Sequence, residues 1–271
     1  MKIRKIAGGF TAAKGFKAAS CEAAIKYQNR RDMALLFTDV PCAVAGTFTS
    51  SRVKAAPVLW DMGIVKSGKP ARAVVVNTGI ANAGTGEEGM RLCSETAKHT
   101  AEILGISADE VLVGSTGVIG PNVPLDRITA GVTAMAKNLS DSAEAGTLAS
   151  KAIMTTDTVN KEYAVEFDLP AASGEGTVTV ISMRCVAPSP SPAMRTARLR
   201  QTVKSASFST PYPGSSAEVT GLLPARPLAR TSRVSLVLVS PSTEIILKVS
   251  FTTSRSACCS RAWSTAQSVV R

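Results

Sequence analysis

Short apolar runs bounded by turn residues recur through residues 1–181 and predict β-strands. The clearest runs lie at 33–39, 43–49, 72–77 and 111–113. Three consecutive valines within 72–77 indicate a strand that is buried on both faces. Two further runs, 161–168 and 178–181, flank a glycine-containing turn and predict an antiparallel pair.

Apolar residues at three- and four-residue steps predict helices between these strands. One stripe, at Met90, Cys93, Ala97, Ala101 and Leu104, predicts a helix over 87–104, and Gly105 stands where a C-terminal cap is expected. A second helix is expected from Asp126, with Ile128, Val132, Met135 and Leu139 on one face, and a third over 142–154. Helices interleaved with strands predict an α/β (α+β layered) architecture.

The pattern breaks at Ile181. Residues 182–271 hold 12 of the 31 lysines and arginines but two of the 20 acids, so they supply +10 of the net charge of +11. A Pro/Ser run occupies 188–192, and the apolar runs at 234–239 and 244–249 are not organised by turn residues. We therefore expect two parts, an enzyme-like part over 1–181 and an unpatterned Ser/Arg/Pro-rich tail over 182–271, either disordered or frameshifted.

Bulk properties narrow the class of protein. No run of about 18 apolar residues predicts a membrane span, and the N-terminus has no apolar signal region. Six cysteines without C-x-x-C spacing are typical of a cytoplasmic protein with free thiols. The basic excess leaves a nucleic-acid binder as a rival interpretation, but the tail lacks interleaved aromatic residues and a clustered basic stripe.

Three constellations could carry chemistry. Residues 77–86 form a small-residue loop between a strand and a helix, which suits an anion but also suits a tight connection. Residues 115–120 pair a hydroxyl with a glycine N–H, an arrangement that can stabilise an oxyanion or can be an ordinary turn. Residues 154–158 form a hydroxyl cluster that could equally cap a helix.

Other chemistries are disfavoured by the residues present. His99 is the only histidine, and we expect it on the surface of the 87–104 helix. A Ser–His or Cys–His mechanism and a multi-histidine metal site are therefore disfavoured. The glycines at 84 and 86 do not continue into a dinucleotide fingerprint, because Glu87 and Glu88 would face a pyrophosphate.

Five short segments, taken in order, resemble the ornithine acetyltransferase family, the bifunctional glutamate N-acetyltransferases of arginine biosynthesis. The segments are Gly8–Ala18, Arg52–Pro57, Val75–Gly86, Ser115–Gly120 and Ile153–Asp157. The family usually has Asn where this chain has Ile80, and Cys where it has Gly84.

The resemblance implies an N-terminal-nucleophile acyltransferase that needs no metal or organic cofactor. Its precursor cuts itself before a threonine, which becomes the nucleophile, and the two resulting chains assemble as a hetero-oligomer. Acetyl passes from N-acetylornithine to that threonine and then to glutamate, with acetyl-CoA as a further candidate donor. By the same resemblance, Thr116 and Gly117 form the oxyanion hole, and Thr155 contacts the substrate.

The resemblance is lost where the nucleophile should lie. The family has a Lys-Gly-x-Gly…Ala-Thr stretch after the strand ending near Ile181, whereas this chain reads Ser182 to Arg195 with no Ala-Thr pair. Thr196 does not stand in the family's context. We expect a reading-frame shift near codon 182, a layer fold truncated after residue 181, and an inactive chain without a nucleophile. The alternative is a non-catalytic protein that binds an acylated amino acid.

Overall fold

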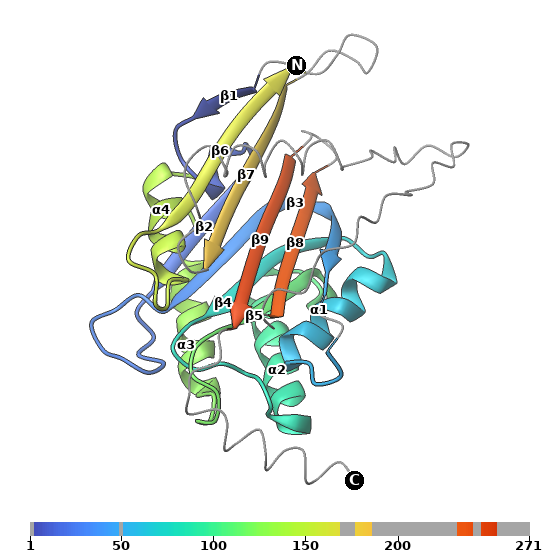
Figure 1. Cartoon of the computed structure of the whole chain (residues 1–271), viewed down its shortest axis with the longest axis vertical. Helices are drawn as coiled ribbons and strands as arrows, with labels where there is room; N and C mark the ends of the chain where they lie inside the picture. The colour runs from blue at the N-terminus through green and yellow to red at the C-terminus, as the bar shows by residue number, and fades with distance from the viewer. Residues whose placement is uncertain (1–2, 49–50, 169–176, 186–231, 241–244, 254–271) are drawn as a thin grey trace. The chain divides into compact units, whose positions relative to one another are not determined.

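A computed structural model describes residues 3–48, 51–168, 177–185, 232–240 and 245–253, which belong to one compact unit of the chain (Figure 1). The nine described strands form a mixed sheet in the order β1-β6-β7-β9-β8-β3-β4-β5, and β2 also pairs with β3. The strands are β1 (Ile3–Ile6), β2 (Phe16–Cys21), β3 (Met33–Thr47), β4 (Ala71–Asn77), β5 (Val111–Ser115), β6 (Lys161–Asp168), β7 (Thr177–Cys185), β8 (Ser232–Ser240) and β9 (Ile245–Thr253).

The described helices follow the strands of the N-terminal part. They are α1 (Ala56–Ser67), α2 (Gly86–Leu104), α3 (Leu125–Ala136) and α4 (Ala143–Ala152), with short 3₁₀ turns at Phe10–Ala12 and Ala108–Glu110. The helices expected over 87–104, from 126 and over 142–154 are thus present, and Gly105 caps α2 in the left-handed conformation, φ 65°. Ser142 begins α4 by accepting a hydrogen bond from the N–H of Ala145. The layered α/β expectation is confirmed.

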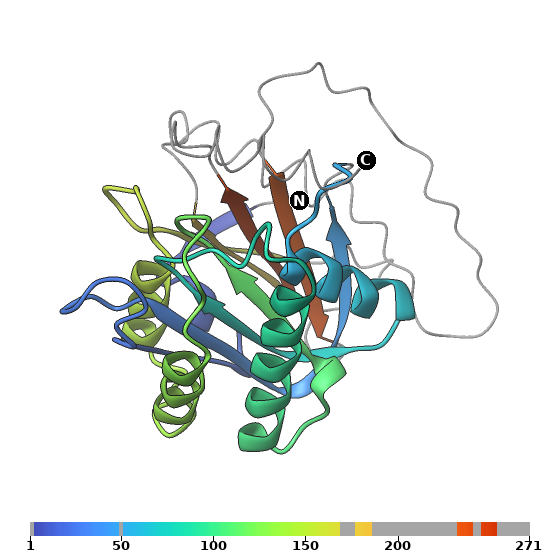
Figure 2. The ribbon, with the colours of Figure 1, turned by 90° about the horizontal axis from the view of Figure 1, so that it is seen from below.

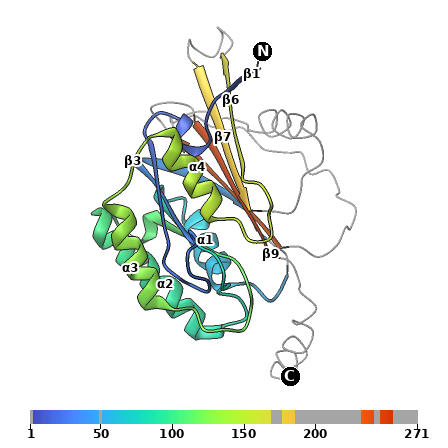
Figure 3. The same cartoon turned by 90° about the vertical axis from the view of Figure 1, so that its left-hand side faces the viewer.

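Two cores lie on opposite faces of the sheet. Val74 and Val76 belong to one core cluster with residues of α4, β7 and the 3₁₀ turn at Phe10–Ala12, while Val75 belongs to a second cluster with residues of α2 and α3. Each of these three valines is at most 1% exposed, because alternate residues of a strand point to opposite faces. The strand buried on both faces is therefore confirmed. Figures 2 and 3 show α2 and α3 side by side against the sheet.

The runs expected as separate strands at 33–39 and 43–49 form one strand, β3. Its pairing with β4 shifts register between Phe37 and Cys42. Pro41 lies inside this irregularity, where its missing N–H breaks no ladder hydrogen bond. The first half of β3 pairs with β2 and β4, and the second half pairs with β8.

The sheet continues beyond residue 181. β7 pairs with β6 antiparallel as expected and runs on to Cys185, while the 169–176 turn lies outside the described residues. The apolar runs at 234–239 and 244–249 fall largely in β8 and β9, which pair with each other and with β3 and β7. Rows of Val, Leu and Ile favour strands even without turn residues. The apolar runs of the tail could be strands on the sequence alone, but no turn residues indicated that they would join the sheet.

None of the described helices has the length and apolar character needed to cross a membrane.

At the β5 edge of the sheet, α1 lies alongside the strand, and Trp60 Nε1 donates to the carbonyl of Val111 at 2.9 Å. This contact occupies a backbone group that an open edge would expose.

Candidate active site

Two loops meet at the carboxyl ends of the parallel strands β4 and β5. The N–H of Thr116 donates to Asn77 O at 3.0 Å, and the N–H of Val118 donates to Gly79 O at 3.0 Å. In return, the N–H of Ala81 donates to Val118 O at 2.9 Å. The loops therefore prolong the parallel ladder beyond the strands, and neither is an independent turn.

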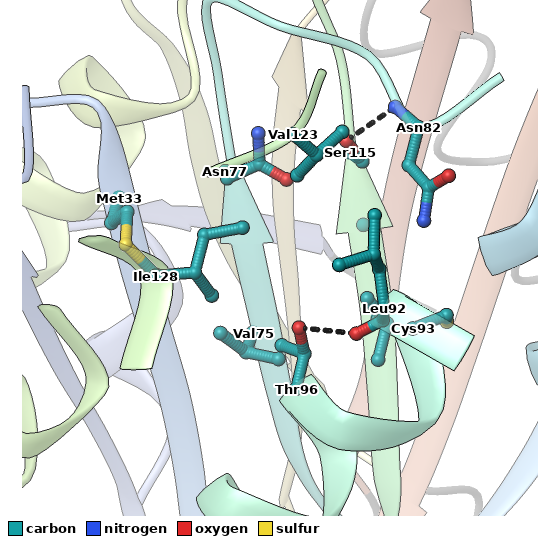
Figure 4. A pocket seen from close by; sticks show the side chains of 12 residues that line it. Met33, Val75, Asn77, Asn82, Leu92, Cys93, Thr96, Ser115, Val123 and Ile128 are labelled. Carbon is teal, nitrogen blue, oxygen red and sulfur yellow. Dashed lines mark hydrogen bonds between the residues drawn. The ribbon is translucent and has the colours of Figure 1, made fainter. Parts of the chain in front are cut away.

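Polar side chains at the ends of β4 and β5 also form hydrogen bonds with the backbone of the 77–86 loop. Ser115 Oγ accepts from the N–H of Asn82 at 2.9 Å and lies 3.2 Å from the carbonyl oxygen of Ile80, to which it donates. Asn77 Nδ2 donates to that same carbonyl at 2.8 Å. Figure 4 shows Asn77, Asn82 and Ser115 at one end of a small, mainly apolar cavity between α2 and the sheet, whose volume is about 10 Å³. Such a cavity holds at most one water molecule, so it is no substrate site.

Gly117 is the closest point of contact between the loops. Its φ is +139°, and a Cβ built there would lie 2.3 Å from Gly79 C and 2.4 Å from Gly79 O. Only glycine fits at this position, because any side chain would collide with the neighbouring backbone. The N–H of Thr116 is engaged by Asn77, but no described residue accepts a hydrogen bond from the Thr116 hydroxyl or from the N–H of Gly117. These two donors are adjacent in the chain.

Thr155 lies in the turn after α4, and this turn connects to the 77–86 loop. Thr78 Oγ1 donates to Ala152 O at 3.1 Å, and Arg30 Nη2 donates to Met154 O at 2.5 Å. The hydroxyl cluster at 154–158 does not cap α4, because the hydroxyl bonded to the helix's last carbonyl comes from Thr78. The three constellations therefore share one connected region, through Asn77, Thr78 and the end of α4.

An open pocket of about 570 Å³ contains Thr155. Its charged and polar lining residues are Arg30, Arg31, Lys151, Thr155, Asp157, Thr158 and Asn160. Thr116 and Gly117 do not line it. The volume lies in the range of small-molecule sites, and the walls carry three cationic side chains against one carboxylate.

That carboxylate is paired. The Asp157 side chain is 1% exposed, and its Oδ1 forms an ion pair with Lys161 Nζ. Oδ2 of Asp157 has no hydrogen-bond partner, and neither has Oε2 of Glu162 on β6, whose Oε1 accepts from Thr147 at 2.7 Å. Among the described residues, no group of three or more His, Cys, Asp or Glu side chains could hold a metal ion.

The expectation that His99 lies on the surface is wrong. The ring is half-buried between α2 and α3, with Nε2 3.1 Å from Thr129 O and 3.0 Å from Thr133 Oγ1. Its helix packs against α3 along this face, which sequence periodicity alone could not place. His99 therefore links two helices and takes no part in the candidate site.

Sequence reasoning missed Arg30 and Asp32, and it assigned Thr78 of the 77–86 loop no role of its own, although all three bind the site's loops together. Asp32 is 4% exposed, and its carboxylate accepts from the N–H groups of Ala23 at 2.7 Å and Ile25 at 2.6 Å. Its carbonyl accepts from the N–H of Thr78 at 2.8 Å. The only signal in the sequence was a run of three charged residues immediately before a strongly apolar strand.

Solved structures share this fold. The crystal structure of the arginine biosynthesis bifunctional protein argJ from Bacillus halodurans matches with a TM-score of 0.64 and 31% identity, covering 70% of this chain and 97% of that one. Ornithine acetyltransferase from Mycobacterium tuberculosis, complexed with ornithine, matches with a TM-score of 0.60 and 36% identity, covering 70% and 98%. The described residues thus have the layered α/β fold of these two solved structures.

The sequence model of the ArgJ family matches residues 17–197, and the chain belongs to this family. The resemblance seen in the sequence is thereby confirmed, and the match extends past the break at residue 181. The Symbiobacterium thermophilum bifunctional protein ArgJ is 47% identical over 180 residues, 66% of this chain and 43% of that protein. The Geobacter sulfurreducens protein is 51% identical over 148 residues, 55% and 37%. The chain spans less than half the length of these relatives.

Proposed function

We propose that this chain carries the oxyanion-binding and substrate-contacting part of an acyltransferase that moves acetyl from N-acetylornithine to glutamate in arginine biosynthesis. The supporting observation is the contact between Gly117 and Gly79, which leaves the Thr116 hydroxyl and the Gly117 N–H as adjacent donors without an acceptor among the described residues. Gly117 is only partly buried, so donors held in place without an acceptor among the described residues can bind an acceptor from outside the chain.

The chemistry of these donors suits acyl transfer. When a nucleophile adds to an acetyl carbonyl, negative charge develops on the carbonyl oxygen, and donors already in place stabilise it without rearranging. The Thr116 hydroxyl and the Gly117 N–H would serve that oxygen. Thr155 would contact the amino-acid part of the substrate from the 570 Å³ pocket. No metal or organic cofactor is part of the proposal.

We further propose that the chain as given lacks the nucleophile. Ser182 to Arg195 replaces the family's Ala-Thr cleavage stretch, so neither self-cleavage into two assembling chains nor the covalent acetyl-threonine step is expected. Donors alone leave only a small part of the rate enhancement when the nucleophile is missing. The proposed partners are the small molecules N-acetylornithine and glutamate, not nucleic acid or membrane, and the proposed location is the cytoplasm.

The test is a glutamate-dependent assay with the purified chain. We expect no ornithine to be released from N-acetylornithine, while calorimetry detects binding of N-acetylornithine. Release of ornithine above a heat-denatured control would overturn the absence of a nucleophile. Absence of both release and binding would overturn the proposed site.

A second candidate function is supported by the pocket itself. The pocket lined by Thr155 and three cationic side chains is present although the chain lacks the expected nucleophile. This combination suits a non-catalytic protein that binds acylated amino acids. Restoring the family's nucleophile stretch separates the two functions. If activity appears, the present chain is an acyltransferase that has lost its nucleophile. If binding is unchanged and activity stays absent, the binding function is favoured.

A further inference from the structure

The turn that carries Thr155 is held by a residue far from it in the sequence. Arg30 Nη2 donates to Met154 O at 2.5 Å and lies 3.5 Å from Thr155 O. Helix α4 ends two residues earlier, so these carbonyls lie at its C-terminus, where unpaired carbonyls and the negative end of the helix dipole favour a cation. Arg30 therefore holds the backbone of the turn that contains Thr155.

Arg30 is itself held in place. It belongs to the connection between β2 and β3, which Asp32 closes through its hydrogen bonds to the N–H groups of Ala23 and Ile25. Ala24 and Asn29 in this connection adopt left-handed φ values of 53° and 57°. Non-glycine residues hold such conformations only where the surrounding structure imposes them. The guanidinium group is thus presented on a preorganised loop.

Most of the guanidinium's donors remain available. The hydrogen bonds of Arg30 to described residues all use Nη2, so no described residue accepts from Nε or Nη1. Arg30 also lines the 570 Å³ pocket. A guanidinium group offers five N–H donors in a planar fork that matches a carboxylate, so the bond to the turn leaves donors for a ligand.

The charge of the pocket defines the ligand. Arg31 and Lys151 add two further positive charges to the walls, while the one carboxylate, Asp157, is already paired with Lys161. The excess of positive charge therefore favours an anion. Thr155 and Asn160 supply polar groups that suit an amide beside that anion.

We propose that Arg30 is a specificity-determining residue of this pocket: it positions the Thr155 turn and binds the carboxylate of an N-acylated amino acid. This inference rests on the proposed function and adds to it the residue that selects the carboxylate. The ligand class is a small acylated amino acid with a free carboxylate, and the same molecule with a carboxamide is discriminated against.

The test uses calorimetry on the full chain with N-acetylglycine, its carboxamide and N-acetylornithine. We expect N-acetylglycine to bind about 10- to 100-fold more tightly than its carboxamide, as for a charge-assisted hydrogen bond. In Arg30→Met this preference falls to a few-fold at most, with any remainder due to the charges of Arg31 and Lys151, and Arg30→Lys retains more of it. The matched control is Arg127→Met: Arg127 donates to the Ala24 carbonyl of the same connection but does not line the pocket, so its loss leaves the preference unchanged.

The outcomes separate this inference from the proposed function. Equal affinity of the wild-type chain for N-acetylglycine and its carboxamide overturns the role of Arg30, even if Arg30→Met does not fold. An Arg30-dependent preference without binding of N-acetylornithine supports the carboxylate site and overturns the proposed substrate. Binding of N-acetylornithine that is unaffected by Arg30→Met leaves the proposed function standing and overturns this inference. No binding of any probe overturns both.

Discussion

The carboxylate of Asp61 on α1 accepts a hydrogen bond of 2.9 Å from the backbone N–H of Val113 on the edge strand β5. Together with the bond from Trp60 to Val111, it lets one helix satisfy both an N–H and a carbonyl along the open edge. Asp61 is 3% exposed, and no ion pair of its side chain is found within the described residues. Burial raises the pKa of Asp61 well above its usual range, and the hydrogen bond from Val113 opposes this only in part.

The raised pKa of Asp61 predicts a stability that falls with rising pH. The folded chain keeps a proton that the unfolded chain releases, so this contribution is complete below the ordinary aspartate pKa and is lost as pH rises towards the folded pKa. Within that window, the loss is about 1.4 kcal/mol per pH unit. Asp61→Asn keeps an acceptor for Val113 and should flatten the profile.

Thermal unfolding followed by circular dichroism from pH 4.5 to 8 measures this effect. Asp126→Asn, at an exposed acid on α3, is the control and should follow the wild-type curve. Parallel curves for the wild type and Asp61→Asn would contradict the assignment of the pH dependence to Asp61.

Gly117→Ala should unfold the paired loops. The new Cβ would meet Gly79 backbone atoms at 2.3 and 2.4 Å, in addition to the strain of a φ of +139°. We expect a loss of about 3 kcal/mol or more in the free energy of unfolding. Urea unfolding provides the measurement. Gly120→Ala is the matched control, because Gly120 has a φ of +121° but nothing within 4 Å of an added Cβ. Equal losses in the two variants would show that contact with Gly79 is unimportant.

Thr155→Val should weaken binding of N-acetylornithine without unfolding the chain. The change removes a hydroxyl from the pocket and keeps the side-chain volume, so the loss should be about 1 kcal/mol, or roughly fivefold in Kd. Calorimetry measures it. Thr158→Val, at a second threonine of the same pocket, controls for a general change in polarity. An unchanged Kd for Thr155→Val would remove Thr155 from the substrate contacts.

Sequencing the encoding DNA across codons 175–200 tests the origin of the tail. We expect a second reading frame to encode a Lys-Gly-x-Gly stretch followed by an Ala-Thr pair. A verified read without the shift would give an intact acetyltransferase, and a confirmed shift would identify an interrupted gene. If no frame contains these motifs, the frameshift explanation is wrong and the tail is native.

Periodicity predicted the helices and strands in which the buried positions are the apolar ones. Helix α2 has a clean apolar stripe and a glycine stop, and β4 has consecutive valines, so each could be recognised alone. Helix α1 was not predicted, because its buried face contains Asp61 while Leu59 is 44% exposed. A buried acid beside an exposed leucine is explained only by the position of α1 next to β5, where Trp60 and Asp61 form hydrogen bonds with the backbone of the edge strand.

The residues of the candidate site likewise fall into those that the sequence indicated and those that only the packed structure shows. The resemblance to the family pointed to Thr116, Gly117 and Thr155, whereas local composition alone left an ordinary turn and a helix cap open as alternatives. The role of Arg30 depends on a turn more than 120 positions away, and that of Thr78 on the end of α4. Neither contact leaves a local pattern in the sequence, since both form only when the chain packs.

The prolonged pairing of β4 with β5 also sets the order in which the chain can fold. Asn77 and Ser115 are register partners 38 positions apart, with all of α2 between them. The two strands of a parallel pair are joined by a crossover connection, which here contains α2, and contacts of this range are slow to form. During synthesis, the donors at Thr116 and Gly117 therefore take their places only after β5 has emerged.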